Sequence, residues 1–151
     1  MIDKLNIGAT MTLELVRNGQ VVETRTIHNK VVNGGFDLVC DMLGNTTRPA
    51  RLGYVAIGTG TATTSDSATA LGTQWGSRVA TTYAHTAGTK LLSLSCVIPA
   101  HTGATVSISE SGLFTASTGG IMFDRVTFTA IQKAAEDTIN IRYVINLAEG
   151  T

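Results

Sequence analysis

The sequence predicts an all-β protein: an antiparallel β-sandwich or jelly roll of about eight strands, with one short helix inserted after the first hairpin. Three observations favour this class. Runs rich in β-branched residues recur roughly every 8 to 15 residues, turns rich in glycine and threonine separate them, and no regular alternation of strands and helices indicates a parallel sheet. The 151 residues fit one domain. We expect an N-terminal arm at 1–9 and a single β-sandwich at 10–151.

Residues 10–29 carry the strongest local signal. Two β-rich runs flank Asn18-Gly19, a dipeptide that favours a two-residue hairpin turn because both turn positions require positive φ. A two-residue loop predicts three facing pairs: Val16 with Val21, Leu15 with Val22, and Glu14 with Glu23. Because the last pair brings two carboxylates together, we expect Arg25, on the same face, to relieve their repulsion.

One helix is predicted after this hairpin. Asn33 is placed to cap its N-terminus, Asp37 lies near the positive end of its dipole, and Gly44 can end it. At helical spacing, one apolar stripe is formed by Phe36, Val39, Cys40 and Leu43. A helix this short is unstable alone in water, so we expect it to cover one end of the sheet.

The rest of the chain is predicted to be β. Further strands are expected at 54–57, 78–85, 90–98, 105–110, 121–129 and 138–147. The last strand shows an unbroken alternation, with Ile139, Ile141, Tyr143, Ile145 and Leu147 on one face. The segment from Thr59 to Gly72 is rich in Thr, Ser, Ala and Gly, which indicates an extended loop with one helical turn near 68–71.

Composition limits the function classes. Eleven basic residues balance eleven acidic ones, which argues against a general nucleic-acid binder. Only 15% of residues are charged, well below the roughly 25% of an average soluble domain, and this suits a protein packed against neighbours. The sequence shows neither a secretory signal nor a membrane span. Cys40 and Cys96 lie in segments that we interpret as core-facing, so we expect buried free thiols, with a disulfide or a metal site as alternatives.

No catalytic, cofactor or metal site is predicted. Gly58-Thr59-Gly60 lacks the third glycine of a dinucleotide fingerprint, so we interpret it as a loop. Ser111 lacks the nucleophile elbow of a hydrolase, and Asp37 and Asp41 share a helix face that indicates a solvated edge. No second ligand stands at metal-site spacing from any histidine, namely His28, His85 and His101.

The remaining candidates are interface residues. Trp75, the single tryptophan, fits an interface anchor and a residue at the rim of the core equally well. The loop before it, 59–74, is either a surface loop or an extension over a neighbouring subunit. The predicted interface consists of the N-terminal segment and this loop, with the candidates Met1, Ile2, Leu5, Ile7, Thr59, Thr61, Thr63, Asp66 and Trp75.

Four segments carry a family resemblance: residues 28–35 (HNKVVNGG), 54–60 (YVAIGTG), 108–114 (ISESGLF) and 119–126 (GGIMFDRV). They resemble small virion structural proteins of tailed bacteriophages, a group that contains capsid decoration (cement) proteins and some tail-associated proteins. The resemblance runs from about His28 to Leu147. Trp75 departs from the pattern, where an acidic residue is commoner. The decoration members imply a jelly roll, trimers at local three-fold positions of the capsid, and N-terminal arms that reach neighbours.

The resemblance implies a phage capsid decoration protein that binds the outside of the assembled head and stabilises the shell without catalysis. Its expected partners are the major capsid protein and itself, as a homotrimer, with no nucleic acid, membrane or small-molecule ligand. Its expected location is the capsid surface of the virion, after synthesis in the bacterial cytoplasm. The alternative is a tail-associated protein of the tip or fibre. A carbohydrate-binding sandwich ranks lower, because only 5% of residues are aromatic.

Overall fold

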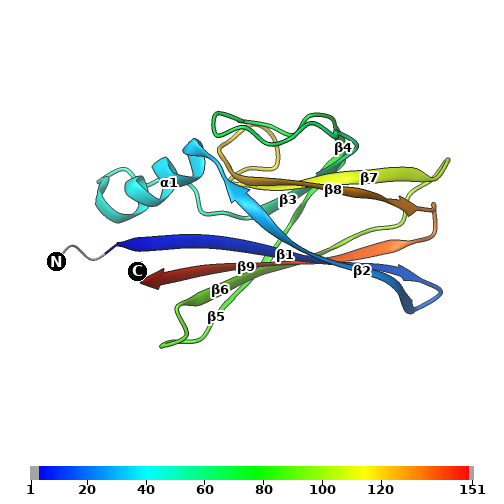
Figure 1. Ribbon diagram of the computed structural model, residues 1–151, viewed down its shortest axis with the longest axis horizontal. Coiled ribbons are helices and arrows are strands. Elements are labelled where there is room, and N and C mark those ends of the chain that lie inside the picture. Colours follow the sequence, from blue (N-terminus) through cyan, green and yellow to red (C-terminus); the bar gives the residue numbers. More distant parts are fainter. Residues whose placement is uncertain (1–3, 150–151) are drawn as a thin grey trace.

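The computed structural model describes residues 4–149 and confirms the all-β class, with nine strands and one helix in this part of the chain (Figure 1). The strands are β1 (Leu5–Arg17), β2 (Gln20–Val31), β3 (Tyr54–Gly58), β4 (Gln74–Ala80), β5 (Thr82–His85), β6 (Leu91–Ile98), β7 (Val106–Phe114), β8 (Met122–Lys133) and β9 (Thr138–Glu149). The helix α1 (Asn33–Gly44) follows β2. The structure has nine strands in this range where the sequence predicted about eight, because the single strand expected at 78–85 is divided into β4 and β5.

The strands form a sandwich that is nearly a barrel. Hydrogen bonds link them antiparallel in the order β4-β3-β7-β8-β2-β1-β9-β6-β5. One layer contains β5, β6, β9, β1 and β2, and the other contains β8, β7, β3 and β4. The layers join where Lys30 and Val31 of β2 pair with Arg125 and Asp124 of β8. At the opposite edges only Thr81 separates β4 from β5, so the chain passes directly from one layer to the other.

The core lies between the two layers. Strand β9 shows the predicted alternation, with Ile139, Ile141, Tyr143 and Ile145 all at most 3% exposed, whereas Leu147 near its end is 37% exposed. Buried residues of the facing layer close the core from the other side, among them Val55, Ile57, Ile108, Leu113 and Phe123. The period-2 pattern therefore correctly identified the inner face of this strand.

The first hairpin has the predicted turn. Asn18 and Gly19 have φ angles of 52° and 75°, and Val16 pairs with Val21. Asparagine and glycine tolerate this left-handed conformation better than other residues. The local sequence therefore determines the position of the turn.

A β-bulge changes the register just beyond the turn. Val22 has no partner across the hairpin, and Leu15 lies opposite Glu23. The predicted Leu15–Val22 pair is therefore wrong, and so is the pair of Glu14 with Glu23. Glu23 instead forms an ion pair with Arg25. The bulge inserts one extra residue into β2, which separates the two carboxylates onto different faces.

Helix α1 begins where predicted but is capped differently. Asn33 is its first helical residue, and Val32 occupies the N-cap position without any side-chain hydrogen bond. No acidic residue lies in the first turn, so Asp37 is too far along the helix to act there. The predicted roles of both polar residues at this helix end are therefore wrong.

The buried face of α1 also differs from the prediction. Gly35 and Leu38 are its buried residues, whereas Phe36 is 48% exposed and Leu43 is 76% exposed. A Cβ atom on Gly35 would overlap the backbone carbonyl of Phe123 in β8. The helix backbone thus packs directly on β8, with Leu38 buried, while Phe36 and Leu43 lie on the more exposed part of the helix.

The two cysteines are free, as predicted, but they are not both buried. Cys40 is exposed, because it belongs to the helix face that turned outward. Cys96 is half-buried against the core. Burial raises the pKa of the Cys96 thiol to about 12, so this thiol stays protonated at neutral pH.

The described residues of the expected N-terminal arm belong to the sheet. Strand β1 begins at Leu5, and residues 5–9 pair with residues 145–149 of β9. The domain therefore includes at least part of this segment, and residues 1–3 lie outside the described range. The helical turn expected near 68–71 is absent from the structure, where this stretch is irregular and buries Leu71.

Candidate interaction surfaces

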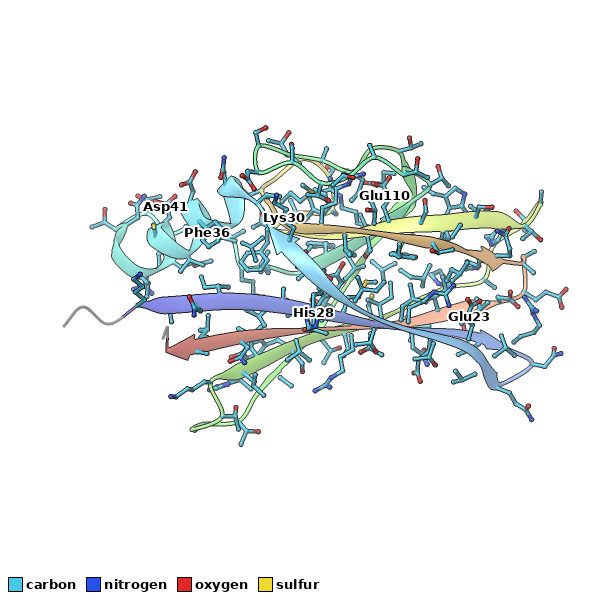
Figure 2. All side chains as sticks on the ribbon, viewed as in Figure 1. Glu23, His28, Lys30, Phe36, Asp41 and Glu110 are labelled. Carbon is cyan, nitrogen blue, oxygen red and sulfur yellow. The ribbon has the colours of Figure 1, made fainter. Side chains whose placement is uncertain are left out.

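The loop between β3 and β4, residues 59–73, is fastened to the sandwich by a buried carboxylate. Glu110 of β7 has no exposed surface and lies beneath this loop (Figure 2). Its Oε1 accepts hydrogen bonds from the backbone N–H groups of Gly60 at 2.9 Å and Thr73 at 2.7 Å. Its Oε2 accepts one from the N–H of Gly72 at 2.9 Å. Both ends of the loop are thus held by one side chain.

Arg125 of β8 supplies the opposite charge. Its Nε donates to Oε2 of Glu110 at 2.9 Å, and its Nη2 lies 2.8 Å from the same oxygen. Burial by itself raises the pKa of Glu110, but the hydrogen bonds from Thr73, Gly72, Arg125 and Gly60 outweigh it and hold the pKa below its usual value. Glu110 is therefore ionised at neutral pH.

The glycines of Gly58-Thr59-Gly60 make room for this carboxylate. A Cβ atom on Gly60 would lie 2.5 Å from Oε1 of Glu110, and one on Gly58 would lie equally close. Thr59 and Gly60 lie in the loop, as predicted, whereas Gly58 is the last residue of β3. The glycines of this motif are needed because the backbone approaches a buried side chain.

The predicted interface residues in this loop face solvent to different degrees. Thr61 and Thr63 are exposed, whereas Thr59 is half-buried. Asp66 is exposed and forms an ion pair with Lys30 of β2 at 2.9 Å. The loop is an ordered surface, fastened from below by Glu110 and from the side by this ion pair.

Trp75 lies at the rim of the core. It is half-buried and packs against the main hydrophobic cluster, and its ring meets that of His101 edge-on, with centroids 4.9 Å apart. Below it, the buried Lys133 donates to the carbonyl oxygen of Asp137 at 2.6 Å and contacts His101 Nδ1 at 3.0 Å. Burial lowers the pKa of Lys133.

The predicted N-terminal residues lie on a different surface from the loop. Leu5 is 57% exposed at the start of β1, and Ile7 is half-buried. Met1 and Ile2 fall outside the described residues. Strand β1 belongs to one layer and the loop is fastened to the other, so the structure divides the predicted interface residues into two separate groups.

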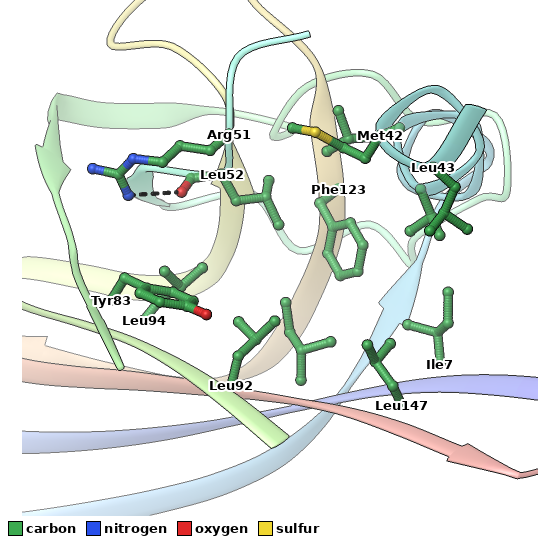
Figure 3. A pocket seen from close by; sticks show the side chains of 13 residues that line it. Ile7, Met42, Leu43, Arg51, Leu52, Tyr83, Leu92, Leu94, Phe123 and Leu147 are labelled. Atoms are coloured by element: carbon green, nitrogen blue, oxygen red, sulfur yellow. Dashed lines mark hydrogen bonds between the residues drawn. The ribbon is translucent and has the colours of Figure 1, made fainter. Parts of the chain in front are cut away.

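An apolar pocket that sequence reasoning missed lies under α1 (Figure 3). Its volume is about 670 Å³, and its lining includes Ile7, Met42, Leu43, Tyr83, Leu92 and Leu147. The residues come from α1, one end of the antiparallel β1–β9 pair, β5, β6, β8 and the segment before β3. The prediction assigned Leu43 to the core, so its position at the edge of an open pocket was missed.

A second surface is the outer face of β6, β9 and β1. A shallow groove of about 500 Å³ crosses it. Six polar side chains in this groove make no hydrogen bond or ion pair with the described residues: Thr12, Glu14, Thr82, Ser95, Asn140 and Arg142. This polar face is free to bind groups outside the chain.

A second buried carboxylate lies where the two layers join. Asp124 accepts hydrogen bonds from Asn29 Nδ2 at 3.1 Å and from the N–H of Leu113 at 3.2 Å. Burial, which these bonds only partly offset, raises its pKa to about 7. Beside it, Tyr143 and Ser111 are hydrogen-bonded at 2.7 Å. The other amide atom of Asn29, Oδ1, is buried without a partner.

Within residues 4–149, no group of three or more His, Cys, Asp or Glu side chains is placed to hold a metal ion. In the same range, no helix has the length and apolar character needed to cross a membrane.

Comparisons with known proteins identify a family. A family model described as podophage GP4 fiber I protein gp80 matches residues 25–144, from β2 to β9. Neither the curated proteins nor the solved structures that were compared contain a match. Because the model matches most of the 151 residues, the chain belongs to the podophage GP4 fiber I protein gp80 family, a family of phage structural proteins.

Proposed function

We propose that the protein is a structural component of a podophage tail fibre and acts by binding neighbouring subunits, without catalysis. The match of residues 25–144 to a fibre protein family carries this proposal. The match favours the tail-associated alternative over capsid decoration, because the family description names a fibre. Membership of a phage structural family also supports a location in the virion.

The outer face of β6, β9 and β1 is suited to subunit contacts. Its side chains that are unpaired among residues 4–149, such as Asn140 and Arg142, can form hydrogen bonds with a partner without breaking any within that range. The neutral net charge and the low content of charged residues limit repulsion between identical copies. Both properties fit a protein that lies among many neighbours.

The expected partners divide between the two locations. A homotrimer is compatible with a fibre and with a capsid surface, so it remains a prediction under either function. Contact with the major capsid protein belongs to the decoration function alone. The position of the protein on the virion therefore decides which partners are relevant.

Gold-labelled antibody against this protein, applied to intact virions and viewed by electron microscopy, tests the proposal. We expect label at the tail, in a small number of positions per particle. Antibody against the major capsid protein provides the control that heads are accessible to labelling. Label spread over the whole head would contradict the fibre proposal and support capsid decoration.

A further inference from the structure

The two outer faces of the sandwich differ in what covers them. The loop 59–73 lies over the layer of β7 and β8 (Figure 1), and the side chains of Glu110 and Arg125 are buried beneath it. On the opposite layer, the outward residues of β1, β9 and β6 are all half-buried or exposed. No segment within residues 4–149 therefore covers this second face.

The uncovered face carries mainly short, stiff side chains. Alternation with the buried Leu13 and Ile141 places the even-numbered residues of β1 and β9 on the outside. Threonine, serine and valine predominate among them and among the outward residues of β6, and no lysine is present. Such side chains lose little conformational entropy when they are covered, and lysine is depleted in protein interfaces. This composition favours contact with another protein.

The two charged residues of this face lie on a diagonal between neighbouring strands. In the β1–β9 register, Thr12 is opposite Arg142 and Glu14 is opposite Asn140. Glu14 and Arg142 thus occupy two opposite corners of a four-residue square, and all four residues line the groove of about 500 Å³. Neither charged side chain is in an ion pair or a hydrogen bond with the described residues. Both charges are therefore available to a partner.

This arrangement is complementary to itself. A two-fold axis that lies in the interface along the Thr12–Asn140 diagonal places Glu14 of one copy over Arg142 of the other, and Arg142 over Glu14. An isologous contact of this kind contains both ion pairs, because each surface meets its own copy. From the usual spacings of strands and residues, the strands of the two copies then cross at about 70°, which is close to the orthogonal class of sheet packing.

We propose that the outer face of β1, β9 and β6 binds the same face of a second copy, with Glu14 of each copy paired to Arg142 of the other. The proposal names the neighbouring subunit that the proposed function leaves open, and in this respect it rests on that function. A two-fold contact closes after two copies, so the product is a dimer. The loop 59–73, on the other layer, stays accessible to further neighbours.

Analytical ultracentrifugation of the purified protein over rising concentration tests the contact. We expect the wild type to form dimers that dissociate as salt is added, because salt screens charges near the surface. Glu14→Arg and Arg142→Glu should each weaken dimerisation about 10-fold or more, since each brings like charges together twice in every dimer. Matched controls are Asp37→Arg and Arg48→Glu, which reverse exposed charges outside the groove, and both should dimerise like the wild type.

Mixing the two single variants is the decisive measurement. One variant has two positive charges in the square and the other has two negative charges, so both contacts between unlike copies are attractive. The mixture should form 1:1 heterodimers at concentrations where each variant alone is monomeric. Combining Glu14→Arg with Arg142→Glu in one chain should also restore the homodimer. The mixture is more informative than this double variant, because mixing cannot repair a defect within one chain.

Four results would each overturn the proposal: a monomeric wild type, single variants that dimerise like the wild type, control variants that weaken dimerisation equally, and a mixture that stays monomeric. A trimeric wild type would also overturn it and would support the homotrimer expected from the family resemblance. Circular dichroism of each variant verifies that it is folded before its association is compared.

These results are separate from the location of the protein on the virion. Head labelling together with the expected pattern of heterodimers would refute the fibre function and leave the two-fold contact standing. Tail labelling together with a monomeric wild type would refute the contact and leave the fibre function standing.

Discussion

Two buried carboxylates on neighbouring strands have opposite properties. Glu110 and Asp124 are both 0% exposed. Glu110 accepts hydrogen bonds from three backbone N–H groups and from the guanidinium of Arg125, and its pKa lies below its usual value. Asp124 accepts hydrogen bonds only from the side-chain amide of Asn29 and from one backbone N–H, and burial raises its pKa to about 7. The number and charge of the donors, rather than depth, decide whether a buried carboxyl stays ionised.

The difference corresponds to two structural roles. The Glu110 carboxylate fastens a loop that has little apolar surface of its own. Asp124 lies where only two residue pairs connect the layers. A fixed charge suits the first position, because many donors converge there. The second position is close to a balance between protonated and ionised forms at neutral pH.

Removing the charge of Glu110 should have the largest effect. Glu110→Gln leaves the guanidinium of Arg125 buried without its counter-ion, and breaking such a pair costs about 3–5 kcal/mol. The free energy of unfolding, measured by urea denaturation, should fall by this amount, and proteolysis within residues 59–73 should become faster. A stable variant with a protected loop would contradict the role of Glu110.

The second prediction concerns the pH dependence set by Asp124. Between the ordinary pKa of 3.8 and the folded-state pKa of about 7, the folded protein holds a proton that the unfolded chain has released. This group therefore lowers the free energy of unfolding as pH rises through that window, by up to about 4 kcal/mol. Asp124→Asn should remove this contribution in urea titrations from pH 4 to pH 8.

The asparagine variant also has a structural reason to be tolerated. Its carbonyl can still accept the N–H of Leu113, and its amide can donate to Asn29 Oδ1, which lacks a partner, once the Asn29 amide is turned. Asp37→Asn, on the exposed surface of α1, is the matched control and should leave the pH profile unchanged. An unaltered pH profile for Asp124→Asn would refute the assignment.

Adding a methyl group at Gly60 tests how tightly the loop 59–73 packs against the Glu110 carboxylate. Because its Cβ would lie 2.5 Å from Oε1 of Glu110, Gly60→Ala should destabilise the fold by about 1–3 kcal/mol. The control is Gly8→Ala in β1, where nothing lies within 4 Å of the added atom. Thermal melts of the two variants should therefore separate clearly, and equal melting temperatures would contradict the tight packing.

The smallest effect is expected for an exposed carboxylate. Glu23 pairs with Arg25, and the two side chains are 33% and 31% exposed. Since such pairs contribute about 0–1 kcal/mol, Glu23→Gln should change the free energy of unfolding by less than 1 kcal/mol. A loss as large as that of Glu110→Gln would show that burial and donor number do not separate the two classes.

Much of the fold follows from local sequence. The Asn18-Gly19 turn, the inner face of β9 and the place of α1 depend on a few adjacent residues, and all three were predicted correctly. Turn conformation and strand alternation are properties of neighbouring side chains and backbone angles. The family resemblance also came from local motifs, and the match to a phage structural family agrees with it.

The candidate surfaces could not be predicted in the same way. The apolar pocket forms where residues from α1, β5, β6, β8 and one end of the β1–β9 pair meet, and its wall depends on which helix face is buried. Glu110 stands as a single acid in the sequence, more than 30 residues from each backbone group that it binds. Neither the pocket nor the set of contacts made by Glu110 leaves a periodic pattern in the sequence from which it could be predicted.

The sequence alone determined the class of the fold, the positions of most of its strands along the chain and the kind of protein that the chain resembles, because these depend on local pattern. The tertiary structure decided the bulge in β2, the face of α1 that packs on β8, and the different charges of Glu110 and Asp124. Each of these depends on groups far apart in the chain, whose distances and donors are fixed only when the two layers pack together.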